Sequence, residues 1–417
     1  MLIRRSAPLG LIAAGAAVVL TLTACGGNST SPTASGGASG AYTKTTNAIT
    51  VLIGSSGAAE TSSVQAAVAA WAAKSGISAK VQVASDLTQE ASQGFASGSP
   101  ADLLYVSTDQ FSGWAKAGNL EAYGDQLANK ADFYPNLVSA FTYNNQFYCA
   151  PKDFSTLALV VNTDKWKAAG LTDADYPTTW AQLESISQKL VAAKQPGLVV
   201  SNEIQRLGVF VAQNGGSLVS ADGKTATVNS DANVAAYTFA KKLLTEGAAK
   251  LNSDVGAGWG GEALGKGLAT MVIEGNWITG VKKDYPTLNY KVVELPAGTQ
   301  KGTLEYTNCW GMSKDGKNKG GALDLVNYLT TTQQQLQFAK DFGVMPSVKS
   351  AASDYKSQFP EMTAFLAGAD YAQNLPAQPG VAAVLADLNS QMAKLKTSDP
   401  KSILDTEQSA MTQALAG

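Results

Sequence analysis

The sequence predicts an α/β fold built from parallel sheets with helices packed against them. Short apolar runs typical of buried strands alternate along the chain with amphipathic segments that have helical spacing. The connections between these segments are short, as they are in doubly wound sheets. The part of the chain from Ala48 to Gly417 is too long for one typical domain, so we expect two.

The first strands and helices establish this pattern. Ile49–Ile53 is apolar enough for a strand, and a helix is expected over 62–75, with Ser62 or Ser63 as its N-cap and Gly76 just past its end. The next predicted elements are a strand at 80–83, a helix at 88–96 and a strand at 102–106.

A second block of the same kind begins near Pro151. Leu157–Val161 is expected to form a strand, and Thr179 is expected to start a helix with a capping box that includes Gln182. The later predicted elements are a helix containing Val234, Tyr237 and Leu244, a strand from Leu268 to Ile273, and helices at 323–329 and 334–342.

The N-terminal residues predict export and attachment to a membrane. Arg4 and Arg5 precede a short apolar run, which is typical of a secretory signal over residues 1–24 and too short for a comfortable membrane span. The small residues before Cys25 resemble the bacterial lipobox, in which this cysteine becomes the lipidated first residue. The alternative is an ordinary signal peptide with an incidental cysteine. Residues 25–47 are expected to form a flexible tether, so the lipid alone holds the body at the extracytoplasmic face of the cell membrane.

Composition excludes several classes of function. Loss of the leader removes Arg4 and Arg5 and leaves 29 basic residues against 33 acidic ones, a net charge of −4 without a basic stripe, so nucleic acid is not an expected partner. The chain has no histidine, which excludes His-dependent catalytic triads and His-containing zinc sites, and we predict no metal and no cofactor. Arg206 is the only arginine that remains, which disfavours a strongly anionic ligand.

Polar residues follow the predicted strands, at the edge of the sheet where open α/β folds bind ligands. Sugars need carboxylates and amides for their hydroxyl groups and an aromatic ring for the C–H face. Glu274 follows the strand at 268–273 and is expected either to face a ligand or to cap the next turn. Trp259 and Trp310 lie in Gly-rich or strand-end contexts, and packing in the core is the alternative for each tryptophan. The candidate ligand-binding residues at strand ends are Glu60, Asp86, Asp109, Asn276 and Trp277, with Trp259 and Trp310 beside them.

Five segments, in order, resemble the extracellular solute-binding proteins of sugar ABC transporters, the group that includes maltose-binding protein. They are "FYCAPKDFSTLALVVNTDKWKAAGL", "YPTTWAQLESISQKL", "GWGGEALGKGLATMVIEGNW", "KNKGGALDLVNYLTTTQQQ" and "GVMPS". The resemblance implies the two-lobe, type II periplasmic-binding-protein-like fold, with a sugar held between the lobes. It places lobe 1 at 48–150 plus 310–345 and lobe 2 at 151–309 plus 346–417.

The same resemblance assigns roles to individual positions. Trp277 matches the stacking aromatic of the family, and Asp153 matches a position at the floor of the cleft. Glu60, Asp86 and Asp109 match positions that contact sugar hydroxyls; for each carboxylate a helix cap or a solvated loop is the alternative. Cys149 and Cys309 depart from the family pattern and fall in segments that resemble neighbouring hinge strands. A Cys149–Cys309 disulfide is expected, with free buried thiols as the alternative.

The sequence therefore predicts a monomeric, lipid-anchored binding protein. It would capture an oligosaccharide or glycoside by hinge closure and deliver it to the membrane subunits of an ABC permease. Two alternatives remain open at this point. One is a secreted glycosidase that uses paired carboxylates, and the other is a binding protein for a non-sugar solute such as a polyamine.

Overall fold

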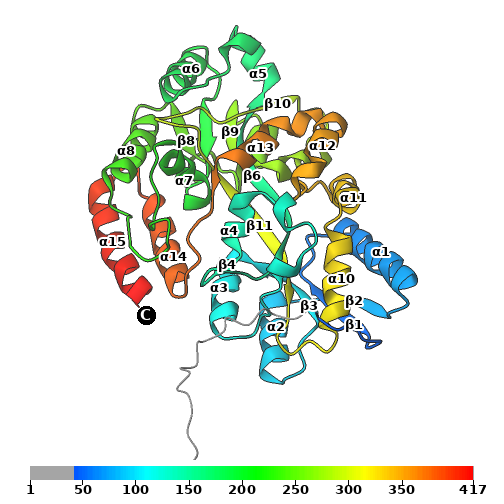
Figure 1. The fold of residues 1–417 in the computed structure, drawn as a ribbon. Coiled ribbons are helices and arrows are strands. Elements are labelled where there is room, and N and C mark those ends of the chain that lie inside the picture. The colour runs from blue at the N-terminus through cyan, green and yellow to red at the C-terminus, as the bar shows by residue number, and fades with distance from the viewer. Residues whose placement is uncertain (1–41, 417) are drawn as a thin grey trace, which may run out of the picture. The chain divides into compact units, whose positions relative to one another are not determined.

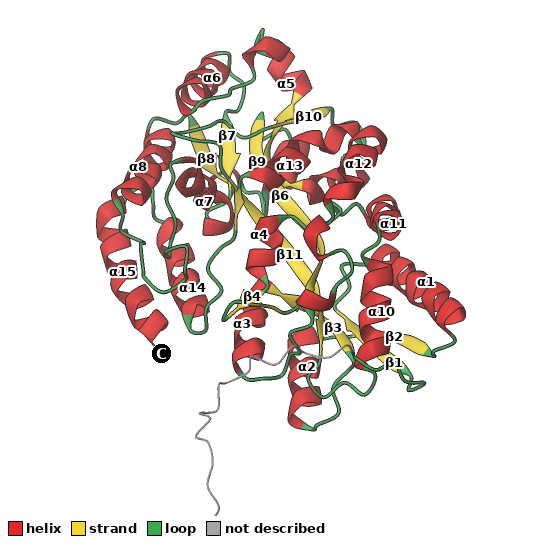
Figure 2. Cartoon of the chain, in the orientation of Figure 1, coloured by secondary structure: helices red, strands yellow, loops and turns green. Residues whose placement is uncertain are grey.

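The computed structural model describes residues 42–416, and its main feature is one mixed sheet with helices on both faces (Figures 1 and 2). The sheet has the strand order β2-β1-β3-β11-β6-β9-β7-β8, with β10 paired to β6 and β12 to β11. The predicted leader, Cys25 and the tether up to residue 41 lie outside the described residues.

The first parallel set of strands follows the sequence prediction closely. It consists of β1 (Ile49–Ile53), β2 (Ala79–Val83) and β3 (Leu103–Ser107), with β1 in the middle. Helices α1 (Ala58–Ser75), α2 (Leu87–Ala96) and α3 (Thr108–Lys116) follow these strands in turn.

Helix α1 begins earlier than the sequence suggested. Its N-cap is Gly57, so the expectation of Ser62 or Ser63 as N-cap was wrong. The Glu60 carboxylate, in the first turn, accepts hydrogen bonds from the backbone N–H and the hydroxyl of Ser56, which precedes the helix. These two hydrogen bonds fix the first turn. Gly76 ends the helix in the left-handed conformation at φ 72°, as predicted.

The second parallel set forms the other end of the sheet. It consists of β7 (Leu198–Val200), β8 (Ala249–Leu251) and β9 (Met271–Gly275), with β7 in the middle. The helices of this part include α6 (Trp180–Ala192), which has Thr179 as its N-cap as predicted. The others that precede β9 are α5 (Thr163–Ala168), α7 (Ile204–Gln213), α8 (Asp231–Thr245) and α9 (Gly260–Gly265).

Two long antiparallel strands, β6 (Ala150–Asn162) and β11 (Thr303–Met312), join the two parallel sets. β11 pairs with β3 on one side and with β6 on the other, while the second half of β6 pairs with β9. The structure joins Cys149 and Cys309 by a disulfide, with Cα atoms 5.7 Å apart, where these strands enter the first parallel set. The sheet therefore passes without interruption from one lobe to the other.

Each parallel set has its own apolar core. The core around β1 draws on buried residues between 49 and 150 and again between 309 and 351. Around β7 and β9, one cluster combines residues 157–304 with 381–411 on one face of the sheet, and another lies on the opposite face. These cores define the two lobes of a type II arrangement.

The remaining elements complete the layers around these cores. They are α4 (Pro135–Ala140), the hairpin β4 (Thr142–Tyr143) and β5 (Gln146–Phe147), β10 (Tyr290–Val293), α10 (Lys319–Leu329), α11 (Thr332–Phe342), α12 (Ala352–Gln358), α13 (Thr363–Ala367), β12 (Ala372–Gln373), α14 (Val381–Met392) and α15 (Pro400–Ala416). Short 3-10 turns connect several of them, including η5 (Asn276–Lys283), which follows β9 directly.

Candidate ligand-binding site

The two joining strands have one partly exposed face. Every residue of β6 is buried except Ser155, and every residue of β11 is buried except Tyr306 and Asn308. Tyr306 lies opposite Ser155, and Asn308 lies between Asp153 on β6 and Ser107 at the end of β3. Because directly paired residues of an antiparallel sheet point to the same side, these hydroxyl, amide and carboxylate groups form a polar floor between the two lobes.

Trp277 lies beside this floor, in the first turn after β9. It is 38% exposed, which is unusual for so large an apolar side chain. The edge of its ring packs against Tyr306, with centroids 5.8 Å apart and an interplanar angle of 70°. Its Nε1–H donates to Oε2 of Glu274 at 2.9 Å. The indole is thus held in place while part of its surface remains accessible.

Glu274 is fully buried behind this tryptophan. Its carboxylate accepts from the backbone N–H of Gly260 at 3.1 Å and from Nη2 and Nε of Arg206 at 3.0 and 3.2 Å. The guanidinium of Arg206 also lies over the Trp277 ring, with Cζ 5.0 Å from the ring centroid. Of the two roles considered for Glu274 from the sequence, direct contact with a ligand is not supported, because the carboxylate is enclosed by these donors.

The first lobe contributes a buried charged cluster to the same region. Glu60 accepts from the Tyr105 hydroxyl and from Nζ of Lys152, both at 3.0 Å. Lys152 also forms an ion pair with Asp153, and its Nζ lies 4.7 Å from the centre of the Tyr105 ring. Lys152 therefore brings together two of the predicted site residues, Glu60 and Asp153, and neutralises one of their two charges.

The shifts in pKa within this cluster follow from burial and from Lys152. Burial alone would raise the pKa of Glu60, but the charge of Lys152 and the hydrogen bonds from Ser56 outweigh it and lower this pKa. Burial raises the pKa of Asp153, and Lys152 offsets only part of that effect. Burial would lower the pKa of Lys152, whereas Asp153, Tyr105 and Glu60 raise it above its ordinary value, so the lysine remains a cation.

The other predicted site residues that follow the strands differ in exposure: two are exposed and one is buried. Asp86 is exposed and caps α2 by accepting from the N–H of Gln89 at 2.9 Å, and Asp109 is exposed in the first turn of α3. Asn276 is 3% exposed; its Nδ2 donates to the carbonyl of Gly343 at 3.0 Å, and its Oδ1 has no partner among the described residues.

The two tryptophans considered beside Trp277 are more enclosed than it is. Trp259 is half-buried at the start of α9, and its ring covers Gly261 so closely that a Cβ there would lie 2.0 Å from a ring atom. Trp310 is fully buried and packs edge-on against Tyr105, with centroids 5.0 Å apart. The expectation that Trp310 contacts a ligand is therefore corrected: this ring belongs to the core of the first lobe, because β11 lies between β3 and β6 at this position and the side chain packs into the buried cluster around β1.

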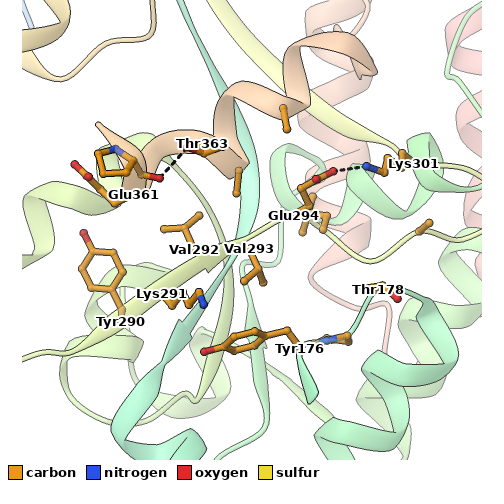
Figure 3. Close-up of a pocket in the computed structure, with 16 residues that line it drawn as sticks. Tyr176, Thr178, Tyr290, Lys291, Val292, Val293, Glu294, Lys301, Glu361 and Thr363 are labelled. Atoms are coloured by element: carbon orange, nitrogen blue, oxygen red, sulfur yellow. Dashed lines mark hydrogen bonds and ion pairs between the residues drawn. The ribbon is translucent and has the colours of Figure 1, made fainter. Parts of the chain in front are cut away.

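Two pockets lie elsewhere, and no predicted site residue lines either of them. One, of about 470 Å³, lies between α4 and α7 and is lined by Asn136, Gly208 and Asn374 among others. The other, of about 570 Å³, lies along the edge strand β10, and an ion pair of 2.6 Å between Lys301 and Glu294 lies at one end of it (Figure 3). Neither combines an exposed indole with the polar floor, so we assign the candidate site to the region around Trp277.

A comparison with protein-family models identifies this architecture. Residues 54–336 match the model described as bacterial extracellular solute-binding protein. The chain belongs to this family. The match includes β2 and β3 of the first parallel set, both joining strands and the region around Trp277, so it covers most of the elements that build the candidate site. Membership places the protein among binding proteins and not among enzymes, so the glycosidase alternative is not supported.

Several known proteins are similar to this solute-binding protein at low sequence identity. A relative from Brucella abortus, named as a binding protein, is 24% identical over 334 residues, which is 76% of this chain and 80% of that one. The sugar-binding protein MalE from Xanthomonas citri has a TM-score of 0.79 at 17% identity and covers 88% of this chain and 97% of its own. The cyclic alpha-maltosyl-1,6-maltose binding protein from Arthrobacter globiformis gives a TM-score of 0.78 at 19% identity, with 88% and 98% of the two chains covered. At these identities the structural likeness shows the fold alone.

The solute-binding protein contains functional groups that sequence reasoning did not select. Lys152 and Tyr306 were not named as site residues, and neither was Glu203, whose Oε1 lies 3.6 Å from Nη1 of Arg206. Arg206 was considered only for its scarcity. Lys152 could have been noticed, because a lysine next to an aspartate is unusual in a run that is otherwise typical of a buried strand.

Across residues 42–416, no helix is both long enough and apolar enough to span a bilayer.

Proposed function

We propose that this solute-binding protein is the substrate-binding component of an ABC importer for a neutral oligosaccharide or glycoside, which binds between the two lobes. The observation that supports the proposal most directly is the exposed indole of Trp277 beside the polar floor of Ser155, Tyr306 and Asn308. An aromatic face next to hydroxyl and amide groups is the combination that a sugar ring requires.

The charges near Trp277 favour a neutral ligand. Arg206 is the only arginine after the leader, and Glu274 already binds its guanidinium. A phosphate or carboxylate would therefore have to compete with a fully buried partner. Glu203 has a side chain that is 43% exposed and makes no capping hydrogen bond to α7; its Oε1 lies 3.6 Å from Nη1 of Arg206, and the exposed part of its carboxylate can accept from hydroxyl donors. A polyamine would need several free carboxylates, and Lys152 already occupies Glu60 and Asp153.

Similar solved structures support the same ligand class. These similar proteins are described with maltose-type and maltodextrin ligands, acarbose and cycloalternan, all of which are carbohydrates. In our proposal the sugar contacts both lobes and favours their closed arrangement, because it binds that arrangement more tightly than the open one. Membrane subunits of a permease then recognise the closed protein. Within the site, Trp277, Glu60, Asp109, Asn276, Asp86, Asp153 and Trp259 remain the proposed ligand-contact or supporting residues.

The location and organisation of the chain are also part of the proposal. We propose a secretory signal at 1–24, lipidation of Cys25 and a tether that ends at residue 47, which would hold a monomer at the outer surface of the cell membrane. Lobe 1 would comprise 48–150 plus 310–345, and lobe 2 would comprise 151–309 plus 346–417. A Cys25→Ser variant should be released into the medium; retention at the membrane would contradict lipid anchoring.

The test is a thermal-shift screen of the purified protein against maltodextrins, trehalose, and cello- and xylo-oligosaccharides, with spermidine as the non-sugar comparison. We expect at least one oligosaccharide to raise the melting temperature without any product appearing in the sample. Stabilisation by spermidine but by no sugar would refute the ligand class. Turnover of the stabilising sugar would refute the assignment as a binding protein.

A further inference from the structure

The contacts around Trp277 show that its indole is fixed by a buried ion pair. Oε2 of Glu274 receives three donors from two side chains: Nε1 of Trp277 at 2.9 Å, and Nη2 and Nε of Arg206 at 3.0 and 3.2 Å. Because Arg206 also lies over the indole, the arginine, the carboxylate and the tryptophan contact one another in a closed triangle. Replacement of any one of these three residues therefore removes two of the three contacts.

Two glycines provide the space that this triangle occupies. A Cβ on Gly275 would lie 2.3 Å from the Trp277 ring, so the indole folds back against the end of β9 only because that residue has no side chain. A Cβ on Gly260 would lie 2.7 Å from Oε1 of Glu274, at the point where the Gly260 N–H donates to this oxygen. Both positions allow a close approach to backbone that a side chain would prevent.

The ion pair is costly to bury and is not needed to fill a core. Glu274 has no exposed side-chain surface, and the Arg206 side chain is 12% exposed. Apolar residues of similar volume often replace such a pair without loss of stability. Its orientation toward the one large exposed aromatic ring at the candidate site indicates a role in recognition.

We infer that Arg206 and Glu274 are positioning residues that hold Trp277 at the angle required for stacking on a sugar ring. This inference rests on the proposed function. Glu274 fixes the indole N–H, Arg206 covers part of the ring, and Tyr306 supports its edge, so the remaining exposed surface of Trp277 has one orientation before the sugar arrives. Preorganisation of this kind lowers the cost of ordering a side chain on binding.

The decisive variant is the double change Arg206→Met and Glu274→Met. It removes both charges together and leaves neither one unpaired in the protein interior, so the apo melting temperature should stay within a few degrees of wild type. Sugar affinity measured by calorimetry should nevertheless fall by at least about tenfold, because the indole is no longer held. Arg206→Lys keeps the charge but not the planar stacking group and should give an intermediate loss.

A matched control comes from the pair in Figure 3. The side chains of Lys301 and Glu294 are 59% and 39% exposed and line the pocket along β10, to which Trp277, Arg206 and Glu274 do not contribute. The Lys301→Met/Glu294→Gln variant should bind the sugar as tightly as wild type. Equal affinity of wild type and the Arg206/Glu274 double variant would overturn the inference, as would a loss of affinity that follows the melting temperature across all variants.

A second readout separates this inference from the proposed function. The indole N–H resonance of Trp277, assigned by its loss in Trp277→Phe, should exchange slowly with solvent in the ligand-free wild type and rapidly in the Arg206/Glu274 double variant. If no sugar binds the wild type, the proposed function fails while this measurement still tests the positioning contacts. If sugar binds and the resonance exchanges equally in both proteins, the positioning role alone fails.

Discussion

Replacement of Glu305 by glutamine should change how the stability of this protein depends on pH. Glu305 lies on β11 and is 3% exposed. Its two carboxylate oxygens accept from Nδ2 of Asn136 in α4 and from Nδ2 of Asn374 after β12, the latter at 2.8 Å. Both partners are neutral amides, so neither balances the charge of an ionised carboxylate. Burial therefore raises the pKa of Glu305 to about 8, with the Asn374 hydrogen bond acting in the opposite direction.

The sign and size of the effect follow from this pKa. Between its ordinary pKa of 4.5 and a folded-state pKa of about 8, the folded protein keeps a proton on Glu305 that the unfolded chain releases. The folded state binds more protons in that range, so its stability falls as the pH rises. Each pKa unit corresponds to about 1.36 kcal/mol, so the ionisation of Glu305 lowers the free energy of unfolding by on the order of 4 kcal/mol between pH 4.5 and pH 8.

The assay is urea unfolding of wild type and Glu305→Gln at several values between pH 4.5 and pH 9, with the disulfide intact. The variant should be less sensitive to pH, and the difference between the two free energies of unfolding should grow with pH up to about 8. No histidine titrates in this range because the chain has none. Glu407, whose pKa burial raises to about 7, contributes equally to both proteins and cancels in the difference.

Glu294→Gln is the matched control with the opposite sign. Burial would raise the pKa of Glu294, but hydrogen bonds from Lys301 and Tyr371 lower it. Stability from this carboxylate is therefore lost as the pH falls through its folded-state pKa, outside the range in which Glu305 acts. Parallel curves for wild type and Glu305→Gln between pH 5 and pH 8 would show that Glu305 is already ionised there and would refute the reasoning.

Three further predictions concern the site and the joining strands. Trp277→Ala should weaken sugar binding, measured by calorimetry, at least about thirtyfold, as expected for an aromatic residue at the centre of a binding surface. The apo melting temperature, measured by thermal unfolding, should shift by only a few degrees. A large loss of apo stability would show that the ring is a core residue. Lys152→Met leaves two buried carboxylates without their cation and should destabilise the protein by about 3–5 kcal/mol in urea unfolding, and an unchanged midpoint would contradict the ion pairing. Cys149→Ser/Cys309→Ser opens a loop of 160 residues and should cost up to about 5 kcal/mol, and dithiothreitol should destabilise wild type but not this variant.

Structural features that depend on local sequence pattern could be predicted from the sequence. Ile49–Ile53, the N-cap Thr179 and the C-cap Gly76 appear in the structure as predicted, because alternation, capping residues and left-handed glycines act over a few residues. The start of α1 was wrong, because Glu60 stabilises the first turn through Ser56 and extends the helix by one turn.

The features that depend on distant pairing could not be predicted. Arg206 and Glu274 are 68 residues apart, and no local pattern relates them. Trp310 follows a cysteine near a glycine, which looked like a strand end, but pairing with Tyr105 places it in the middle of the sheet. Gly275 makes room for the indole of Trp277, and only three-dimensional packing reveals that role.

The arrangement of the two cores also determines the order in which the protein can assemble. The core of the first lobe needs residues 309–351, which are synthesised only after the first segment of the second lobe, residues 151–309. The second lobe in turn needs residues 381–411 from α14 and α15 near the end of the chain. The first core cannot close before residue 351 is made, the core that contains α14 and α15 cannot close before the end of the chain is made, and both depend on contacts of large sequence separation. We therefore expect refolding to be slow and to leave apolar surface exposed until the last helices dock, and a delay of this kind suits the export across a membrane that we propose.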